Sequence, residues 1–199
     1  MSEIAPMNDD QIGGAVTWTV PPVATARLHL RRFEPDDFDL LDRLNRDPAV
    51  MQHMGGPMSS DASAIMLRER ILDYYQAHPG LGIWATLASD SGRCIGMHAL
   101  NHMHGESHIQ IGYRLFPEFW GQGYATEMSR VLIRYGFECL RLPTIVGITD
   151  PGNLGSQRVL LKCGLHPGGL RWFAHPAYAA YGPQLWYECD RDAWLAKHG

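Results

Sequence analysis

The sequence lacks the features that mark a nucleic-acid-binding protein, a membrane protein or a secreted protein. Its 17 Lys and Arg residues are outnumbered by 21 Asp and Glu residues, so no basic excess attracts nucleic acid or an anionic membrane. No apolar run approaches the ~20 residues that span a bilayer. Residues 1–20 lack the basic-then-apolar order of a signal peptide. We therefore expect a cytoplasmic protein with no nucleic-acid or membrane partner.

Cysteine is also scarce, and its spacing argues against a disulfide framework. The four cysteines, Cys94, Cys139, Cys163 and Cys189, lie far apart and form no C-x-x-C pair. In an intracellular protein of this size such residues are typically free and mostly buried thiols. Neither a disulfide scaffold nor a zinc site is expected.

What is present is an ordinary globular composition. The chain has 199 residues, 45% of them hydrophobic and 19% charged, which is enough for one domain with a substantial core. There are no internal repeats and no linker long enough to separate two domains. We expect a weakly ordered leader over residues 1–20 and a single domain over residues 21–199.

The hydrophobic pattern predicts strands and helices in the order βααβββαβαββ. Strands are expected near residues 25–33, 82–88, 93–101, 108–116, 143–149, 165–173 and 184–190, and helices near 35–46, 62–77, 123–140 and 153–164. Short connections join the second, third and fourth strands in a meander. This order indicates an α+β fold, with helices packed on a mixed and mostly antiparallel sheet.

A Gly-x-Gly turn joins the fourth predicted strand to an amphipathic helix. Gly121 and Gly123 permit positive φ angles and let a ligand approach the main chain closely. The helix that follows directs its first free N–H groups, and the positive end of its dipole, toward the space above the turn. The turn therefore predicts an anion site that suits a pyrophosphate. It lacks the lysine of a P-loop, so ATP is not expected.

Three segments in chain order resemble one family, the GNAT superfamily of N-acetyltransferases. Residues 25–33 resemble a T-x-R-L-x-L-R opening, residues 111–127 an acetyl-CoA pyrophosphate loop, and residues 153–164 an N-x-x-S-x-x-V-x-x-K-x-G-F helix. The resemblance is closest to the branch that includes the ribosomal-protein alanine N-acetyltransferases. It covers roughly residues 25–190.

The sequence departs from this pattern at two positions. Leu165 follows Gly164 where the branch usually has phenylalanine, which is a change of packing. Leu160 stands where many members of the wider superfamily have an acidic tyrosine. The branch itself commonly lacks that tyrosine and is thought to use the serine that matches Ser156.

The resemblance implies an α+β GNAT-like fold, with helices on both faces of the sheet and the fourth and fifth strands splayed apart. Acetyl-CoA, the cosubstrate, would lie in that gap. Main-chain N–H groups of residues 121–126 would hold its pyrophosphate, and residues 111–114 would pair with the pantetheine amide as an added strand does. The cofactor-binding residues implied are Ile111, Gly112, Tyr113, Arg114, Gly121, Gln122, Gly123, Tyr124, Ala125, Thr126, Asn153 and Ser156.

Each catalytic candidate implied by the resemblance also has a structural interpretation. Ser156 is either a small helical residue or the proton donor to the departing sulfur. Asn153 is a helix N-cap that also orients the cofactor. Glu106 and His108, near the start of the fourth strand, are the candidates for the general base. The alternative is that both are exposed loop residues and that a chain of waters removes the proton.

Two further features have alternative interpretations. Trp120 either covers the glycine turn or packs in the core, and core packing is favoured. His102, His104 and His108 allow a metal site, but the family needs no metal and a single carboxylate lies near, so no metal is expected.

The resemblance implies an N-acetyltransferase that moves acetyl from acetyl-CoA to a primary amine by direct attack in a ternary complex. Helices 35–46 and 62–77 and the loop 174–183 would form the pocket walls. This loop lacks the carboxylates that a polycationic aminoglycoside demands, so the expected acceptor is a protein N-terminus or a small-molecule amine. An acyl-CoA-binding module without turnover is the alternative. The protein is expected to be a monomer or a homodimer.

Overall fold

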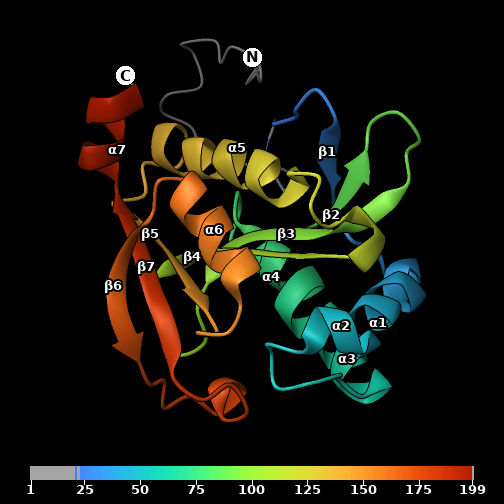
Figure 1. Cartoon of the computed structure of the whole chain (residues 1–199). Coiled ribbons are helices and arrows are strands. Elements are labelled where there is room, and N and C mark those ends of the chain that lie inside the picture. The colour runs from blue at the N-terminus through green and yellow to red at the C-terminus, as the bar shows by residue number, and fades with distance from the viewer. Residues whose placement is uncertain (1–20, 22, 199) are drawn as a thin grey trace.

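In the computed structural model, which describes residues 21 and 23–198, the strands form one mixed sheet (Figure 1). The strands are β1 (Leu28–Arg31), β2 (Gly82–Ala88), β3 (Cys94–His102), β4 (Ile109–Leu115), β5 (Thr144–Thr149), β6 (His166–Arg171) and β7 (Gln184–Asp190). They lie in the order β1-β2-β3-β4-β5-β7-β6, and only β4 and β5 pair in parallel among these described strands. The mostly antiparallel sheet is confirmed, while the expected leader lies outside the described residues.

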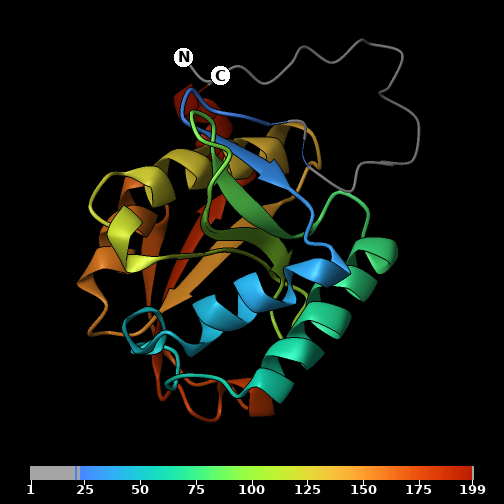
Figure 2. The same ribbon diagram turned by 90° about the vertical axis from the view of Figure 1, so that its right-hand side faces the viewer.

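Helices cover both faces of this sheet, as expected. The helices are α1 (Phe38–Arg46), α2 (Pro48–Met51), α3 (Ser60–Ile65), α4 (Asp73–Ala77), α5 (Tyr124–Glu138), α6 (Leu154–Lys162) and α7 (Arg191–His198), and 3-10 turns span Pro35–Asp37, Pro117–Phe119 and Pro176–Tyr178. Gly136 of α5 lies against Leu100 of β3 on one face, whereas Arg114 of β4 reaches Asn45 of α1 on the other. We call these the α5 face and the α1 face. Figure 2 shows α1 and the run from α3 to α4 grouped together, away from α5.

The sheet opens in a V between β4 and β5. These strands pair only at Ile109 with Ile145 and at Gln110 with Val146, although β4 continues to Leu115. On its other side β4 pairs with β3 along its whole length. The edge of β4 that faces β5 therefore carries unpaired main-chain groups beyond the second pair. The splay expected between the fourth and fifth strands is confirmed.

Two helical predictions need correction. The helix expected over residues 62–77 is a helical run from Ser60 to Ala77 whose middle, Met66–Leu72, is a π-helix, a rare form that often lies at functional sites. The predicted order also omits α7, whose buried Trp194 packs 5.5 Å from the Phe137 ring. Because α7 follows β7 with no turn residue between them, the sequence gives no boundary signal there.

Within the described residues, no helix is long and apolar enough to cross a membrane. The four cysteines are free thiols, of which Cys163 and Cys189 are buried and Cys94 and Cys139 are partly exposed. Burial raises the pKa of the Cys163 thiol to about 12. This sulfur is therefore protonated at neutral pH and a poor nucleophile.

Candidate active site

The glycine turn between β4 and α5 has the geometry of an anion site. Gly121 and Gly123 have left-handed φ angles of 74° and 83°, which residues with a Cβ adopt rarely. A Cβ at Gly121 would meet nothing within 4 Å, so the described residues leave the space above the turn open. The N–H of Glu127 bonds to Gly123 O at 2.9 Å. The N–H groups that precede it in α5 have no helical partner and can bind a ligand.

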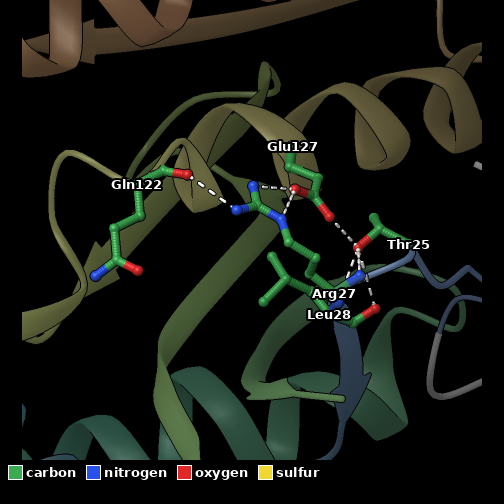
Figure 3. A network of polar contacts seen from close by, with 5 residues as sticks. All are labelled: Thr25, Arg27, Leu28, Gln122 and Glu127. Carbon is green, nitrogen blue, oxygen red and sulfur yellow. Dashed lines mark hydrogen bonds and ion pairs between the residues drawn. The ribbon is translucent and has the colours of Figure 1, made fainter. Parts of the chain in front are cut away.

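Arg27, just before β1, connects this turn to the first turn of α5 (Figure 3). Its Nε donates to Glu127 Oε2 at 2.7 Å, and its Nη1 donates to the main-chain oxygen of Gln122 at 3.2 Å. The guanidinium carbon lies 4.4 Å from the centre of the Tyr124 ring, and Thr25 also donates to Glu127. The segments around residues 25–33 and 111–127 therefore meet in space.

Glu127 is a carboxylate in the first turn of a helix that offers an anion site. Burial alone would raise the pKa of Glu127, but hydrogen bonds from Arg27 and Thr25 outweigh it and hold the pKa below its ordinary value. The carboxylate is therefore ionised, and the charge of Arg27 compensates it. Arg27, Thr25 and Glu127 belong to the motifs described above, but the sequence pattern predicts no role for them.

The open edge of β4 leads directly into the glycine turn. Residues 111–114 lie on this edge, beyond the last pair with β5. Their side chains alternate between the faces: Tyr113 points to α6 on the α5 face, whereas Arg114 points to α1. Main-chain groups and the turn thus form one continuous surface along the V.

Ser156 and Asn153 lie at the start of α6, against Tyr113. Asn153 Oδ1 accepts from the N–H of Ser156 at 2.9 Å, which confirms the expected N-cap. Tyr113 Oη lies 3.0 Å from Ser156 Oγ and 3.1 Å from Ser156 O. Burial raises the pKa of Tyr113, so its phenol stays protonated and can donate. The hydroxyl of Ser156 is held in place by this contact.

The core position expected for Trp120 is wrong. Its side chain is 44% exposed, and its Nε1 donates to Leu115 O at 2.7 Å. The indole therefore lies over the end of β4, because the 3-10 turn Pro117–Phe119 holds this part of the chain at the surface. Leu160, at the position of the missing tyrosine, is buried against Gly147 of β5.

Glu106 and His108 form an exposed pair just before β4. His108 Nδ1 lies 2.9 Å from Glu106 Oε2, and the His108 ring lies 5.1 Å from the Trp186 ring, edge to face. Trp186 shares a buried cluster with Val146 on the α1 face. The structure thus brings the two base candidates together but separates them from Ser156, which lies on the α5 face. No hydrogen bond joins the pair to Ser156 in the described part of the chain.

The remaining histidines of the hairpin have separate surroundings. His98 is fully buried with Nδ1 2.7 Å from Thr86 Oγ1, and burial lowers its pKa to about 4. His102 Nδ1 lies 2.6 Å from Tyr74 Oη, and the His104 ring stacks 5.3 Å from His175. The described residues contain no group of three or more potential ligands placed to hold a metal. His102, His104 and His108 are therefore not brought together as one group of potential ligands.

One of the expected pocket walls, the loop 174–183, lies against the segment that follows α2. A hydrophobic cluster beside the loop 174–183 contains the buried residues Met103, Val146, Tyr178 and Trp186. Gly55, which follows α2, lies against Ala180 and Tyr181 of that loop. The loop and the segment after α2 therefore form adjoining parts of one surface beside the V.

Sequence reasoning missed a polar pair on this surface. His53, after α2, places Nδ1 3.2 Å from Oδ1 of Asp150, which follows β5. The two residues are 97 positions apart in the chain, and no local motif links them. Only the folding of β5 beside α2 could reveal the pair.

Comparisons with known proteins agree on one family. The model of the Acetyltransferase (GNAT) domain matches residues 27–166. FsC-acetyl coenzyme A-N(2)-transacetylase of Aspergillus fumigatus is 32% identical over 155 residues, which cover 73% of this chain and 65% of that protein. Putative ribosomal N-acetyltransferase YdaF of Bacillus subtilis is 31% identical over 144 residues, or 69% of this chain and 76% of that protein. The crystal structure of an acetyltransferase from Agrobacterium tumefaciens has a TM-score of 0.71 and 26% identity, covering 84% of this chain and 92% of that chain.

Proposed function

The chain belongs to the GNAT family of acetyltransferases and is an acetyl-CoA-dependent acyltransferase, and on this basis we propose that it acetylates a primary amine by direct attack in a ternary complex. One observation carries this proposal: the open edge of β4 continues into the glycine turn. A thioester donor with a pyrophosphate at one end fits such a surface. We propose a protein N-terminus or a small-molecule amine as the acceptor.

The proposed donor site uses mostly main-chain groups. The N–H groups of residues 121–126 hold the pyrophosphate at the start of α5. The pantetheine amide pairs with residues 111–114 as an added strand does. Asn153 and Ser156 border the donor from α6.

Arg27 is a positioning residue in this proposal. It holds the carbonyl of Gln122 and compensates the charge of Glu127, which lies in the same helical turn as the proposed phosphate site. An uncompensated carboxylate there would repel an anion. Arg27 therefore favours pyrophosphate binding indirectly, because it fixes the glycine turn and neutralises Glu127.

The chemistry requires a neutral amine, and a proton donor assists the departure of the thiolate. His108, oriented by Glu106, takes a proton from the amine, directly or through a chain of waters. The nitrogen then attacks the thioester carbonyl, and the C–S bond breaks. Ser156, held by Tyr113, donates a proton to the departing sulfur, and the second proton that the acetylated nitrogen loses restores the serine hydroxyl. No acyl-enzyme forms, so the four thiols take no part.

The relatives support an amine acceptor of more than one kind. The name of the fungal relative states transfer from acetyl coenzyme A to an N(2) position, and the name of the bacterial relative states a ribosomal substrate. The family match favours turnover over an acyl-CoA-binding module. A panel of acceptors distinguishes between a protein N-terminus and a small amine.

Incubation of the whole protein with acetyl-CoA and a panel of peptides and small amines tests the proposed function. We expect one class of amine to gain the mass of an acetyl group, with release of an equal amount of free thiol. Binding of acetyl-CoA without an acetylated product across the panel would establish the binding module instead. Separate E106Q and H108A variants, compared by the dependence of kcat on pH, test the assignment of the general base. An unchanged pH profile in both variants would exclude Glu106 and His108 from that role.

A further inference from the structure

The guanidinium of Arg114 has an unusual set of partners. It projects from β4 onto the α1 face and donates to Oδ1 of Asn45, which is fully buried. Its other contacts are two thioether sulfurs, Met51 Sδ at 3.7 Å and Met66 Sδ at 4.0 Å. No carboxylate of the described residues forms an ion pair with it. One amide oxygen is therefore its main acceptor.

This arrangement leaves a cation without a counter-ion. A guanidinium presents several N–H donors in a planar fork, and thioether sulfur is a weak acceptor. Holding a desolvated charge without a partner is unfavourable, and burial correspondingly lowers the pKa of Arg114. By contrast, Arg31 makes two hydrogen bonds with the carboxylate of Asp37, at 2.6 and 2.7 Å. Arg114 is only partly buried, and Asn45 accepts from Nη1 alone, so the donors of the guanidinium fork that Asn45 does not use can bind an anion from outside the chain.

The position of Arg114 indicates which ligand would supply that anion. The glycine turn opens α5, on the opposite face of the sheet, so the pyrophosphate of the donor lies away from this side chain. The α1 face carries the expected walls of the acceptor pocket. Met51, which contacts Arg114, is two residues from His53, and His53 reaches Asp150 across the V. Arg114 thus lies on the acceptor side of the opening.

We propose that Arg114 binds a carboxylate of the acceptor, so that the preferred substrate carries a carboxylate near the amine that is acetylated. A planar guanidinium binds a carboxylate through two parallel hydrogen bonds, which would also fix the direction of the nearby amine. This inference rests on the proposed amine acetylation and narrows its acceptor class. Free amino acids and peptides with an early acidic residue share this chemistry.

Matched acceptors test the inference directly. Each free amino acid is compared with its carboxamide, and each peptide with an acidic second residue is compared with its amide counterpart. We expect kcat/KM to favour the carboxylate member of at least one series by about tenfold or more, chiefly through KM. The series that shows the preference identifies the source of the carboxylate.

Variants of Arg114 then assign the preference to this side chain. R114M replaces the cation by a side chain that suits Met51 and Met66, and we expect it to bring the ratio of carboxylate to amide near one. The ratio is measured within one protein, so a general loss of activity cancels. R93M, at an exposed arginine between β2 and β3 and outside the expected pocket walls, is the matched control and should keep the ratio. If R114M does not fold, R114K should still lower the ratio severalfold, because lysine lacks the planar fork.

The outcomes separate this inference from the proposed function. Acetylation of amines with no carboxylate preference overturns the role of Arg114 and leaves acetyl transfer standing. A preference that R114M and R114K both retain also overturns it. Failure to acetylate any amine overturns the proposed function itself.

Discussion

The two faces of the sheet beside β4 are built in different ways. On the α5 face, the candidate donor site consists of a glycine turn, a helix N-terminus and a strand edge, all within residues 109–127. On the α1 face, the surface consists of side chains from distant segments, such as Arg114, His53 and Asp150. Main-chain groups recognise what many ligands share, whereas side chains distinguish one ligand from another. We therefore expect the donor site to depend more on its backbone than on any one side chain.

Gly121→Trp is the strongest test of the candidate donor site on the α5 face. The new side chain would fill the open space above the turn and strain a residue with φ of 74°. We expect the Kd for acetyl-CoA to rise by more than about 100-fold, or roughly 3 kcal/mol, as measured by calorimetry. Gly92→Trp is the matched control, since Gly92 has φ of 66° and equally open surroundings in another turn. Equal affinity in the two variants would show that the turn does not bind the donor.

The pH dependence of folding stability tests whether His98, on the α5 face, is buried as a neutral imidazole. Its pKa is about 4 in the folded protein and 6.5 ordinarily, so between these values the unfolded chain binds the extra proton. Stability from this residue is thus complete above pH 6.5 and decreases as pH falls toward 4, by about 3 kcal/mol. Urea unfolding across this range should show a correspondingly smaller decrease for H98Q than for the wild type. Parallel pH dependences would contradict the assignment.

Arg27→Ala tests whether acetyl-CoA binding at the candidate donor site depends on a side chain. Loss of the cation leaves Glu127 uncompensated beside the proposed phosphate site, and we expect the KM for acetyl-CoA to rise about tenfold. Acetyl-pantetheine, which lacks the pyrophosphate, should show no matching rise. The double variant R27A/E127Q should recover part of the loss, because it removes the repelling charge as well. A similar defect with both donors would indicate a general structural role instead.

Ser156→Ala should have the smallest effect. A coenzyme A thiolate is a good leaving group, so we expect kcat to fall only about threefold, well below the range of strong acid catalysis. Y113F is the companion variant, since it removes the hydroxyl that holds Ser156 and should produce a similar change. A loss above about 100-fold in S156A alone would make this serine an essential acid.

The comparison also explains how much the sequence could predict. The strands, the glycine turn and the Asn153 cap were predictable because their signals lie within a few residues. The turn at Gly121 and Gly123 has the left-handed angles that its glycines suggested. The N-cap bond from Asn153 to Ser156 spans three residues. Local physics was sufficient for these features.

Other features were not predictable in the same way. The direction of the Arg114 side chain matters only because α1 and the π-helix bring Asn45 and Met66 to it. The exposure of Trp120 depends on where a 3-10 turn places its ring. Helix α7 was missed because no turn residue separates it from β7. Each miss involves a contact or boundary that the tertiary structure decides.

The contacts of Arg27 have a thermodynamic consequence for donor binding. A glycine-rich loop ordinarily loses much conformational entropy when it closes on a ligand. Here the carbonyl of Gln122 and the first turn of α5 are already fixed to the residues around β1 (Figure 3). Part of the ordering is therefore complete when the chain folds, and the loop meets its ligand preorganised. In the proposed donor site, the segment just before the edge strand β1 would thus contribute to affinity without contacting the ligand.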